Sequence, residues 1–424
     1  MLKKIISGLM FLILISCGTT TKIVKETKQQ TQPYENIEGG NLENNENKLT
    51  VAILLPLSGK AEKIGNSMLK SAQLAMFDSK LDNIILKPYD TKGTASGATE
   101  AINSVIKDNA DIVIGPLFTQ TTKAIIDIAA INNLMILSFS DNQSLLDENH
   151  NNVYLMGFTQ KQEIERIISY LVSNKNYYGF SAMFPSDIYG SSASKTFKDV
   201  VFRKDSKIVK IDFYSKNDSN LESKINSLLE MNTYRDEVYK KYKEDKALAK
   251  AQGLGNDVEF KYTDDDKIYA DALLIPDSGN ELNNIADILA KYSGTHKPLL
   301  VGTSKWLNNP LYNNANFNGT LFVASNPNDY SSFENNYYST FNSYPLRVSS
   351  LAYDAVKAVM EAYSQAGEKN NLKYAIENYQ GFEGANGKYR FLSNGFVERK
   401  LSIIKILDGK YEIIDYDNNE FLKY

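Results

Sequence analysis

Cysteine, histidine and tryptophan are scarce in this chain of 424 residues, which holds one Cys, two His and one Trp. A single Cys cannot form an intramolecular disulfide, and a zinc site built from Cys and His needs more ligands than the chain provides. No Ser, Asp and His arrangement typical of a catalytic triad surrounds His150 or His296. The net charge is −4, so there is no basic excess for nucleic acid. We therefore expect a binding protein rather than an enzyme, with no cofactor, metal site or catalytic residue.

The overall composition is that of a globular protein, with 42% hydrophobic and 23% charged residues. At about 150 residues per domain, the length alone suggests about three domains. The pattern of residues along the chain, described next, refines this estimate of the number of domains.

The first 16 residues have the features of an export signal. Lys3 and Lys4 precede an apolar stretch, residues 5–15, that is too short to span a bilayer. It ends at Leu14-Ile15-Ser16-Cys17, which resembles the lipobox of bacterial lipoproteins. The resemblance implies acylation of Cys17, and an ordinary secreted protein is the alternative. Gly18 in place of Asp implies an outer-membrane lipoprotein that faces the periplasm of a Gram-negative bacterium.

Residues 17–48 are polar and show no hydrophobic period, which predicts a flexible tether after the lipid anchor. A coil of this length has an r.m.s. reach of roughly 30 Å. The globular part of the protein would therefore begin near residue 49.

From residue 49 onward, apolar runs of strand length alternate with stretches of helical period, which predicts parallel α/β structure with doubly wound sheets. The expected strands are 49–55, 84–86 (stopped near Pro88), 111–116, 134–137, 153–156, 180–184, 208–213, 272–275, 299–301, 321–323, 388–392, 401–407 and 411–414. The expected helices are 64–80, 98–107, 119–131, 162–172, 191–201, 221–231, 281–292, 333–343, 349–365 and 371–379. Asp408-Gly409 predicts a hairpin turn between the last two strands.

Residues 232–266 are rich in charge and predict a solvated helical excursion from the second half of the fold, with a partner-docking arm as the alternative. Within it, Asp264-Asp265-Asp266 lacks the alternating acidic spacing of a calcium loop and predicts a solvated turn.

Several motifs, taken in order, resemble those of type I periplasmic binding proteins. They are Val51–Gly59, Asp111–Leu117, Tyr189-Gly190, Ala352–Val356 and Gly387–Gly395. The resemblance implies two Rossmann-like lobes that close on a ligand about a hinge. It places three crossovers near 157–159, 324–327 and 392–395. Lobe one is then 49–158 plus 326–393, and lobe two is 159–325 plus 394–424.

Leu55–Gly59, Asp90-Thr91 and Ala110–Leu117 are most similar to the penicillin-binding-protein activator lipoproteins. This resemblance implies a non-enzymatic protein that regulates peptidoglycan synthesis by contact with a penicillin-binding protein. A longer activator form has a helical-repeat domain where this chain has only a tether. The alternative is a solute-binding protein, similar to the leucine/isoleucine/valine-binding proteins, that delivers amino acids or similar small polar ligands to a transporter or sensor.

Ligands of open α/β sheets bind outside the carboxyl ends of the strands. The side chains expected there, and hence the candidate ligand-binding residues, are Thr119, Gln120, Ser140, Asp141, Tyr189, Asp277, Ser278, Thr303 and Trp306. Tyr189 is placed in the cleft only by the resemblance. Structural roles remain open for the others: a helix N-cap for Thr119, turn formation for Ser140 and Asp141, a helix cap for Asp277 and Ser278, and core packing for Trp306.

Overall fold

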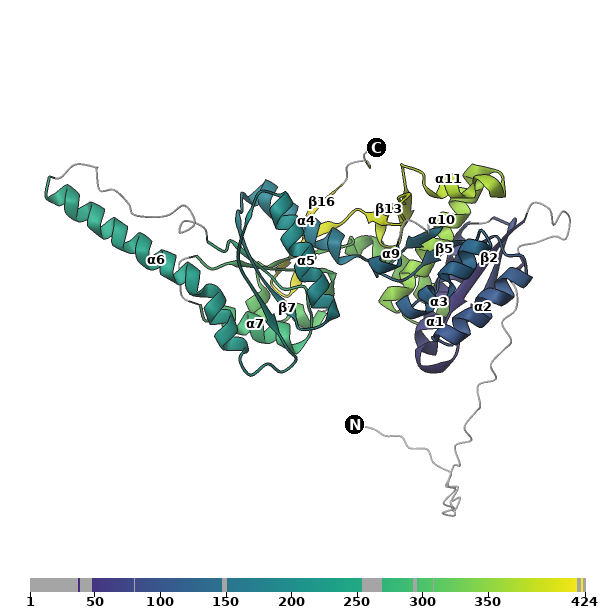
Figure 1. Ribbon diagram of the computed structural model, residues 1–424, viewed down its shortest axis with the longest axis horizontal. Coiled ribbons are helices and arrows are strands. Elements are labelled where there is room, and N and C mark those ends of the chain that lie inside the picture. The colour runs from purple at the N-terminus through teal and green to yellow at the C-terminus, as the bar shows by residue number, and fades with distance from the viewer. Residues whose placement is uncertain are drawn as a thin grey trace, which may run out of the picture. The chain divides into compact units, whose positions relative to one another are not determined.

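The computed structural model of the chain describes residues 37–38, 48–79, 81–146, 151–253, 269–292, 296–307, 309–417 and 421 (Figure 1). The expected signal segment, Cys17, most of the expected tether, His150 and Asp264 to Asp266 lie outside the described residues. Among the described residues, no helix combines the length and the apolar character needed to cross a membrane.

The first half of the chain forms a six-stranded sheet, which together with its covering helices we call lobe one. Its strand order is β1-β3-β2-β4-β5-β6, and only the β1–β3 pair is antiparallel. Without β1, this is a doubly wound order whose direction reverses between β2 and β4. The strands are β1 (Ile37–Glu38), β2 (Leu49–Leu55), β3 (Ile84–Asp90), β4 (Ile112–Ile114), β5 (Met135–Ser138) and β6 (Val153–Leu155).

Helices cover both faces of this sheet because its strands are apolar on both sides. Val51 and Ile53 belong to the core shared with α1 and α10, whereas Ala52 and Leu54 belong to the core shared with α2 and α3. The helices of lobe one are α1 (Glu62–Ser79), α2 (Ala95–Lys107), α3 (Thr119–Ile131), α9 (Pro327–Phe341), α10 (Ser350–Ala366) and α11 (Leu372–Ile376).

Two edge features of lobe one differ from the sequence prediction. Strand β3 continues through Pro88, which pairs with Ile53, whereas β1 pairs with β3 only at Ile85 and Leu86. Pro88 therefore lies at an edge of the described sheet, where proline is tolerated because no neighbouring strand needs its missing N–H. Strand β1 itself lies within the expected flexible tether, so that part of the segment is paired with the sheet.

Lobe two contains a seven-stranded sheet of order β16-β15-β11-β10-β9-β7-β8. Strands β7 to β11 are parallel, again in doubly wound order, and β15 and β16 add an antiparallel hairpin. Asp408 and Gly409 both have positive φ, which confirms the predicted hairpin turn. The strands are β7 (Gly179–Pro185), β8 (Lys207–Tyr214), β9 (Ala272–Leu274), β10 (Leu299–Gly302), β11 (Leu321–Ala324), β15 (Ser402–Leu407) and β16 (Lys410–Tyr416).

The helices of lobe two also cover both faces of their sheet. One core joins the strands to α4 and α5, and the other joins them to α6 and α7. These helices are α4 (Gln160–Lys175), α5 (Ile188–Arg203), α6 (Leu221–Ala251), α7 (Asn280–Ala290) and the short α8 (Asn309–Tyr312).

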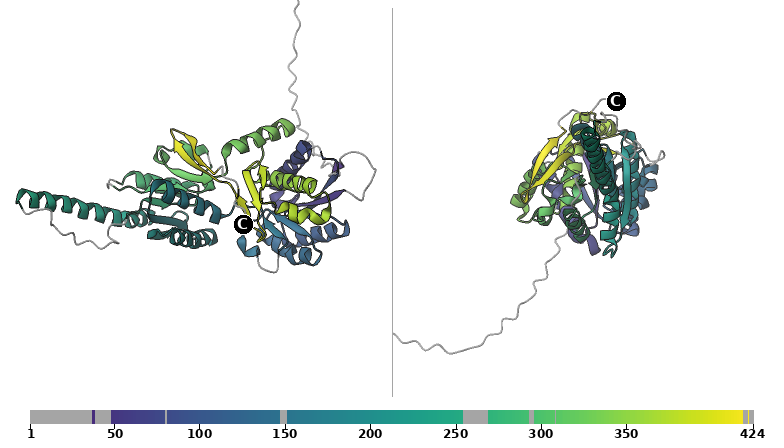
Figure 2. Two further views of the ribbon diagram at one scale, coloured as in Figure 1. Left: turned by 90° about the horizontal axis from the view of Figure 1, so that it is seen from above. Right: turned by 90° about the vertical axis from the view of Figure 1, so that its left-hand side faces the viewer.

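Helix α6 unites the predicted helix 221–231 with the first part of the predicted excursion. In its first turns, Ile225, Leu228 and Leu229 are buried in the core of lobe two. The side chain of Asn232 forms hydrogen bonds with the backbone of Ala270. Beyond this point most side chains are charged and exposed, and the helix runs on past the sheet to Ala251 (Figures 1 and 2). Residues 254–268, the rest of the excursion, lie outside the described range.

The chain passes between the two sheets three times, which agrees with the predicted two-lobed fold class. The first two passages are at 156–159 and 325–326. The third is at 400–401, whereas the sequence predicts it at 392–395. Those residues instead form the turn between β13 (Gly387–Phe391) and β14 (Val397–Arg399), which with β12 (Phe382–Gly384) make a small antiparallel sheet.

Candidate functional site at the carboxyl ends of the two sheets

In lobe one, the predicted residues Thr119 and Ser140 lie together beside the carboxyl ends of β4 and β5. The Oγ1 atom of Thr119 is 2.9 Å from the Oγ atom of Ser140. Thr119 is the first residue of α3 rather than its N-cap, which is Phe118. Ser140 also accepts a hydrogen bond from the backbone N–H of Asn142, so it shapes the turn as well.

The two other predicted residues of lobe one, Gln120 and Asp141, are more exposed than Thr119 and Ser140. Gln120 is exposed, and its Nε2 atom donates a 3.4 Å hydrogen bond to the carbonyl oxygen of Gly93. Asp141 is exposed. Burial is the main cause that raises the pKa of both Glu163 and Tyr189 in lobe two, and the charge of Asp141 adds to it. The charge of Asp141 is therefore within electrostatic range of this part of lobe two.

Tyr189 lies in the first turn of α5, at the carboxyl end of β7. Burial is the main cause that raises the pKa of its hydroxyl, and the charge of Glu163 is the next. The ammonium of Lys305 lies over the ring, with its Nζ atom 3.6 Å from the ring centroid. The structure therefore places Lys305 against Tyr189, with the charges of Asp141 and Glu163 within electrostatic range of that tyrosine. The sequence analysis identifies Tyr189 and Asp141 but not Glu163 or Lys305.

Glu163 is a buried carboxyl in the first turns of α4, just after the first passage between the lobes. It is 4% exposed, and its Oε1 atom has no hydrogen-bond partner among the described residues. Burial raises its pKa to about 7, although Ser304 and the ammonium of Lys305 offset part of this rise. The nearby Thr159 Oγ1 atom is also buried and unpaired in the described structure.

A sequence signal for Glu163 exists in the helical period. Glu163, Ile167 and Leu171 are spaced four apart on the buried stripe of α4. A carboxyl within an apolar stripe costs free energy unless a partner or a function retains it. Lys305 offers no such signal, because it is an exposed lysine in a short turn.

Asp277 and Ser278 line a cavity of about 600 Å³ in lobe two, at the carboxyl ends of β7, β8 and β9. Asp277 accepts a 2.7 Å hydrogen bond from the hydroxyl of Tyr214, and Asp187 caps α5 through the N–H of Gly190. Neither Asp277 nor Ser278 caps a helix, because the N-cap of α7 is Gly279. The lining of the cavity also includes Asp187, two residues before Tyr189 in the chain.

Trp306 is a core residue, which agrees with the alternative of core packing and not with a place in the cleft. Its side chain is fully buried, its Nε1 atom donates a 3.1 Å hydrogen bond to the carbonyl of Ile275, and its ring packs edge-on against Phe317. Gly302 lies directly under the ring, where a Cβ atom would approach it to 2.0 Å. Thr303, the next residue, is also fully buried, in the loop that carries Lys305.

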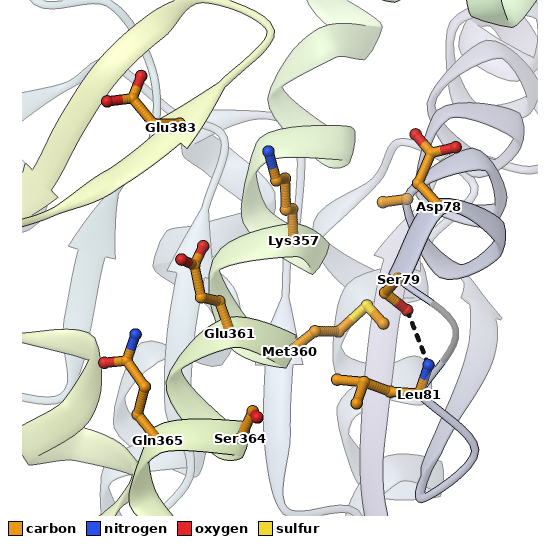
Figure 3. A pocket seen from close by; sticks show the side chains of 10 residues that line it. Asp78, Ser79, Leu81, Lys357, Met360, Glu361, Ser364, Gln365 and Glu383 are labelled. Atoms are coloured by element: carbon orange, nitrogen blue, oxygen red, sulfur yellow. Dashed lines mark hydrogen bonds between the residues drawn. The ribbon is translucent and has the colours of Figure 1, made fainter.

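A separate groove of about 430 Å³ lies between α1 and α10 on lobe one (Figure 3). Its walls carry the carboxylates of Asp78, Glu361 and Glu383 and the ammonium of Lys357, and Met360 contributes to its floor. None of the residues predicted from the sequence lines this groove.

Glu163, Tyr189 and Lys305 can recognise a ligand by hydrogen bonds, by charge and through an aromatic face. In the part of the chain that the structure describes, no three His, Cys, Asp or Glu side chains come together in a way that could hold a metal ion. A buried carboxyl with an unpaired oxygen and a tyrosine ring are groups that bind a small polar molecule.

Comparison with known sequences finds a matching family model and a related protein. A family model described as periplasmic binding protein matches residues 48–231. An uncharacterized protein of Rickettsia prowazekii (strain Madrid E) is 21% identical over 263 residues, which are 61% of this chain. This chain spans only 61% of that relative's length.

Solved structures share the fold at low sequence identity. A branched-chain amino acid ABC transporter periplasmic ligand-binding protein from Burkholderia xenovorans LB400 has a TM-score of 0.64 at 13% identity, covering 87% of this chain and 95% of its own. The substrate-binding protein LivJ from Streptococcus pneumoniae, in complex with isoleucine, has a TM-score of 0.54 at 17% identity, covering 87% and 99%. The chain therefore has the two-lobed fold of type I periplasmic binding proteins.

Proposed function

We propose that this chain is a member of the periplasmic binding protein family that captures a small polar ligand between its two lobes, without catalysing a reaction. The observation that carries this proposal is the cluster of Glu163, Tyr189 and Asp141, in which the buried Oε1 atom of Glu163 lacks a protein hydrogen-bond partner in the described structure. A buried polar atom without a protein partner needs a hydrogen bond from a ligand or from water.

The class of ligand follows from the residues around the cluster. Carboxyl, hydroxyl and phenol groups lie at the carboxyl ends of both sheets, and this favours a ligand with several hydrogen-bonding groups, such as an amino acid. The S. pneumoniae protein of the same fold is bound to isoleucine, which supports this choice. A periplasmic location is part of the same proposal.

A thermal-shift screen against the common L-amino acids and muropeptides tests the proposal. A ligand that binds only the native state adds RT ln(1 + [L]/Kd) to the stability, about 2.7 kcal/mol at a hundredfold excess over Kd. We expect at least one ligand to raise the Tm by several degrees, and Tyr189→Ala to weaken its binding at least about tenfold. Tyr374→Ala, at an 85% exposed tyrosine of lobe one, is the matched control and should bind as the wild type does. If no compound in the screen raises the Tm, the proposal is contradicted.

A second candidate function is regulation of peptidoglycan synthesis by contact with a penicillin-binding protein. Helix α6 favours it, because its outer turns present exposed charged and aromatic side chains, among them Tyr239, Lys240 and Lys243. Such a helix offers a surface to another protein. The lipid anchor on Cys17, with the protein at the outer membrane and facing the periplasm, belongs to this proposal and would hold the surface near the cell wall.

The second candidate is tested with the purified chain and the bifunctional penicillin-binding proteins of the same cell. We expect a complex in size-exclusion chromatography and faster glycan-strand synthesis when the chain is added. The double substitution Lys240→Glu and Lys243→Glu should weaken the complex if α6 makes the contact, since it reverses two exposed charges. No complex and no change in synthesis would exclude this function.

A further inference from the structure

Lys305 is an exposed lysine whose ammonium lies over the ring of a partly buried tyrosine, Tyr189. It belongs to the turn Ser304–Trp306, whose backbone is held by the fully buried Trp306, while its own side chain is exposed. Its ammonium lies 3.6 Å from the centroid of the Tyr189 ring. It makes no hydrogen bond or ion pair with the described residues, so the aromatic face is its main contact there.

The groups around this ammonium are those that hold a positively charged ligand. The ring of Tyr189 presents its negative face, and the carboxyls of Glu163 and Asp141 lie close enough to act electrostatically on the same tyrosine. The charge of Lys305 also acts on Glu163. An aromatic face beside carboxyl groups, one of them with an unpaired oxygen, is an arrangement that attracts an alkylammonium group.

We propose that Lys305 is the protein's own occupant of a cation subsite in the cleft, and that a primary alkylammonium group of a ligand takes its place. This inference rests on the proposed capture of a small ligand at the same cluster. The ammonium of Lys305 occupies the aromatic face on which an external cation would lie, and it repels that cation. Lys305 thus acts as an internal competitor that selects for ligands able to displace it.

The displacement is easy because Lys305 is exposed and its side chain is long and flexible. A cation–π contact at an exposed site is weak, and the repulsion between two ammonium groups a few ångströms apart in a wet site is of similar size. Removing Lys305 eliminates both the cation–π contact that competes with the ligand and the repulsion between the two ammonium groups. We expect alkylammonium affinity to rise about tenfold, which corresponds to about 1.4 kcal/mol.

Isothermal titration of the purified chain with n-butylammonium chloride tests the inference. Lys305→Ala should bind this probe about tenfold more tightly than the wild type. Lys297→Ala, at another exposed lysine of lobe two, is the matched control and should bind like the wild type. At pH 9, above the pKa of Glu163, adding Glu163→Gln to Lys305→Ala should reverse the gain, because the carboxylate that receives the ammonium is lost. Lys305→Met, which retains an apolar stem, should reproduce the gain if Lys305→Ala is poorly folded.

Equal affinity of wild type and Lys305→Ala, or an equal gain in Lys297→Ala, overturns the inference. So does a gain in Lys305→Ala that survives Glu163→Gln, since the cation would then bind elsewhere. The amino-acid and muropeptide screen judges the proposed function on the wild type, whereas the ratio of two alkylammonium affinities judges this inference. Tight binding of n-butylammonium by Lys305→Ala with a flat wild-type screen would support the subsite and contradict ligand capture by the native chain.

Discussion

At the scale of single residues, burial decides the chemistry of Glu163. The side chain belongs to an ordinary charged residue type, but its place on the buried stripe of α4 makes the neutral carboxyl the preferred form. Its pKa rises from an ordinary 4.5 to about 7, mainly through desolvation. The same burial leaves one carboxyl oxygen without a protein partner in the described structure, so the residue is costly to keep unless the site uses it.

This burial predicts a pH dependence of stability. Because the pKa of Glu163 is higher in the folded than in the unfolded state, its contribution to stability is complete below pH 4.5 and is lost between pH 4.5 and about 7. The loss is about 3 kcal/mol, since each unit of pKa difference corresponds to about 1.4 kcal/mol. Glu163→Gln should remove this loss, so that the variant gains on the wild type as the pH rises from 5 to 8 in urea unfolding. The control is Glu222→Gln at an exposed site, and parallel pH curves for wild type and Glu163→Gln would refute the assignment.

At the scale of elements, both lobes repeat one tight strand-to-helix connection. Strands β2 and β7 end at or just before a proline, Pro56 or Pro185, and the following helix approaches that proline's carbonyl oxygen through a glycine. A Cβ atom on Gly65 would lie 2.1 Å from the Pro56 oxygen, and one on Gly190 would lie 1.9 Å from the Pro185 oxygen. The second connection places Tyr189, the residue before Gly190, at the carboxyl end of β7.

Gly190→Ala should therefore destabilise the protein by about 3 kcal/mol, because the added methyl meets a backbone atom that can move only with the strand. Ser191→Ala, at the next and exposed position, should change the free energy of unfolding by less than about 0.5 kcal/mol. Urea unfolding of both variants provides the measurement. A Gly190→Ala protein as stable as the wild type would show that α5 does not pack against Pro185 as closely as described.

At the scale of the whole molecule, a buried ion pair links lobe one to the passages between the lobes. The Nη1 atom of Arg399 lies 3.8 Å from the Oδ2 atom of Asp354 on α10, and both side chains are almost fully buried. The guanidinium also donates a 2.7 Å hydrogen bond to the carbonyl of Met156, at the first passage. Arg399 itself comes directly before the third passage, so one side chain ties two passages to the core of lobe one.

Arg399→Met should cost about 3–5 kcal/mol, because it leaves the carboxylate of Asp354 buried without its cation. Combining it with Asp354→Asn should recover part of this loss, since the buried charge is then removed as well. Urea unfolding of the single and double variants tests the coupling. If the double variant is less stable than the sum of the two single effects predicts, the two residues do not stabilise the protein as a pair.

The sequence by itself determined the α/β rhythm, the two doubly wound lobes and the hairpin turn at Asp408-Gly409, because hydrophobic period and turn chemistry are local properties of the chain. It also identified Tyr189 and Asp141 as candidates. The tertiary structure alone decided that Trp306 is core, that the third passage lies at 400–401, that Glu163 is buried and that Lys305 lies over the ring of Tyr189. These outcomes depend on which distant segments pack together. Burial, charge proximity and strand pairing are properties of that packing, and the local pattern of residues does not contain them.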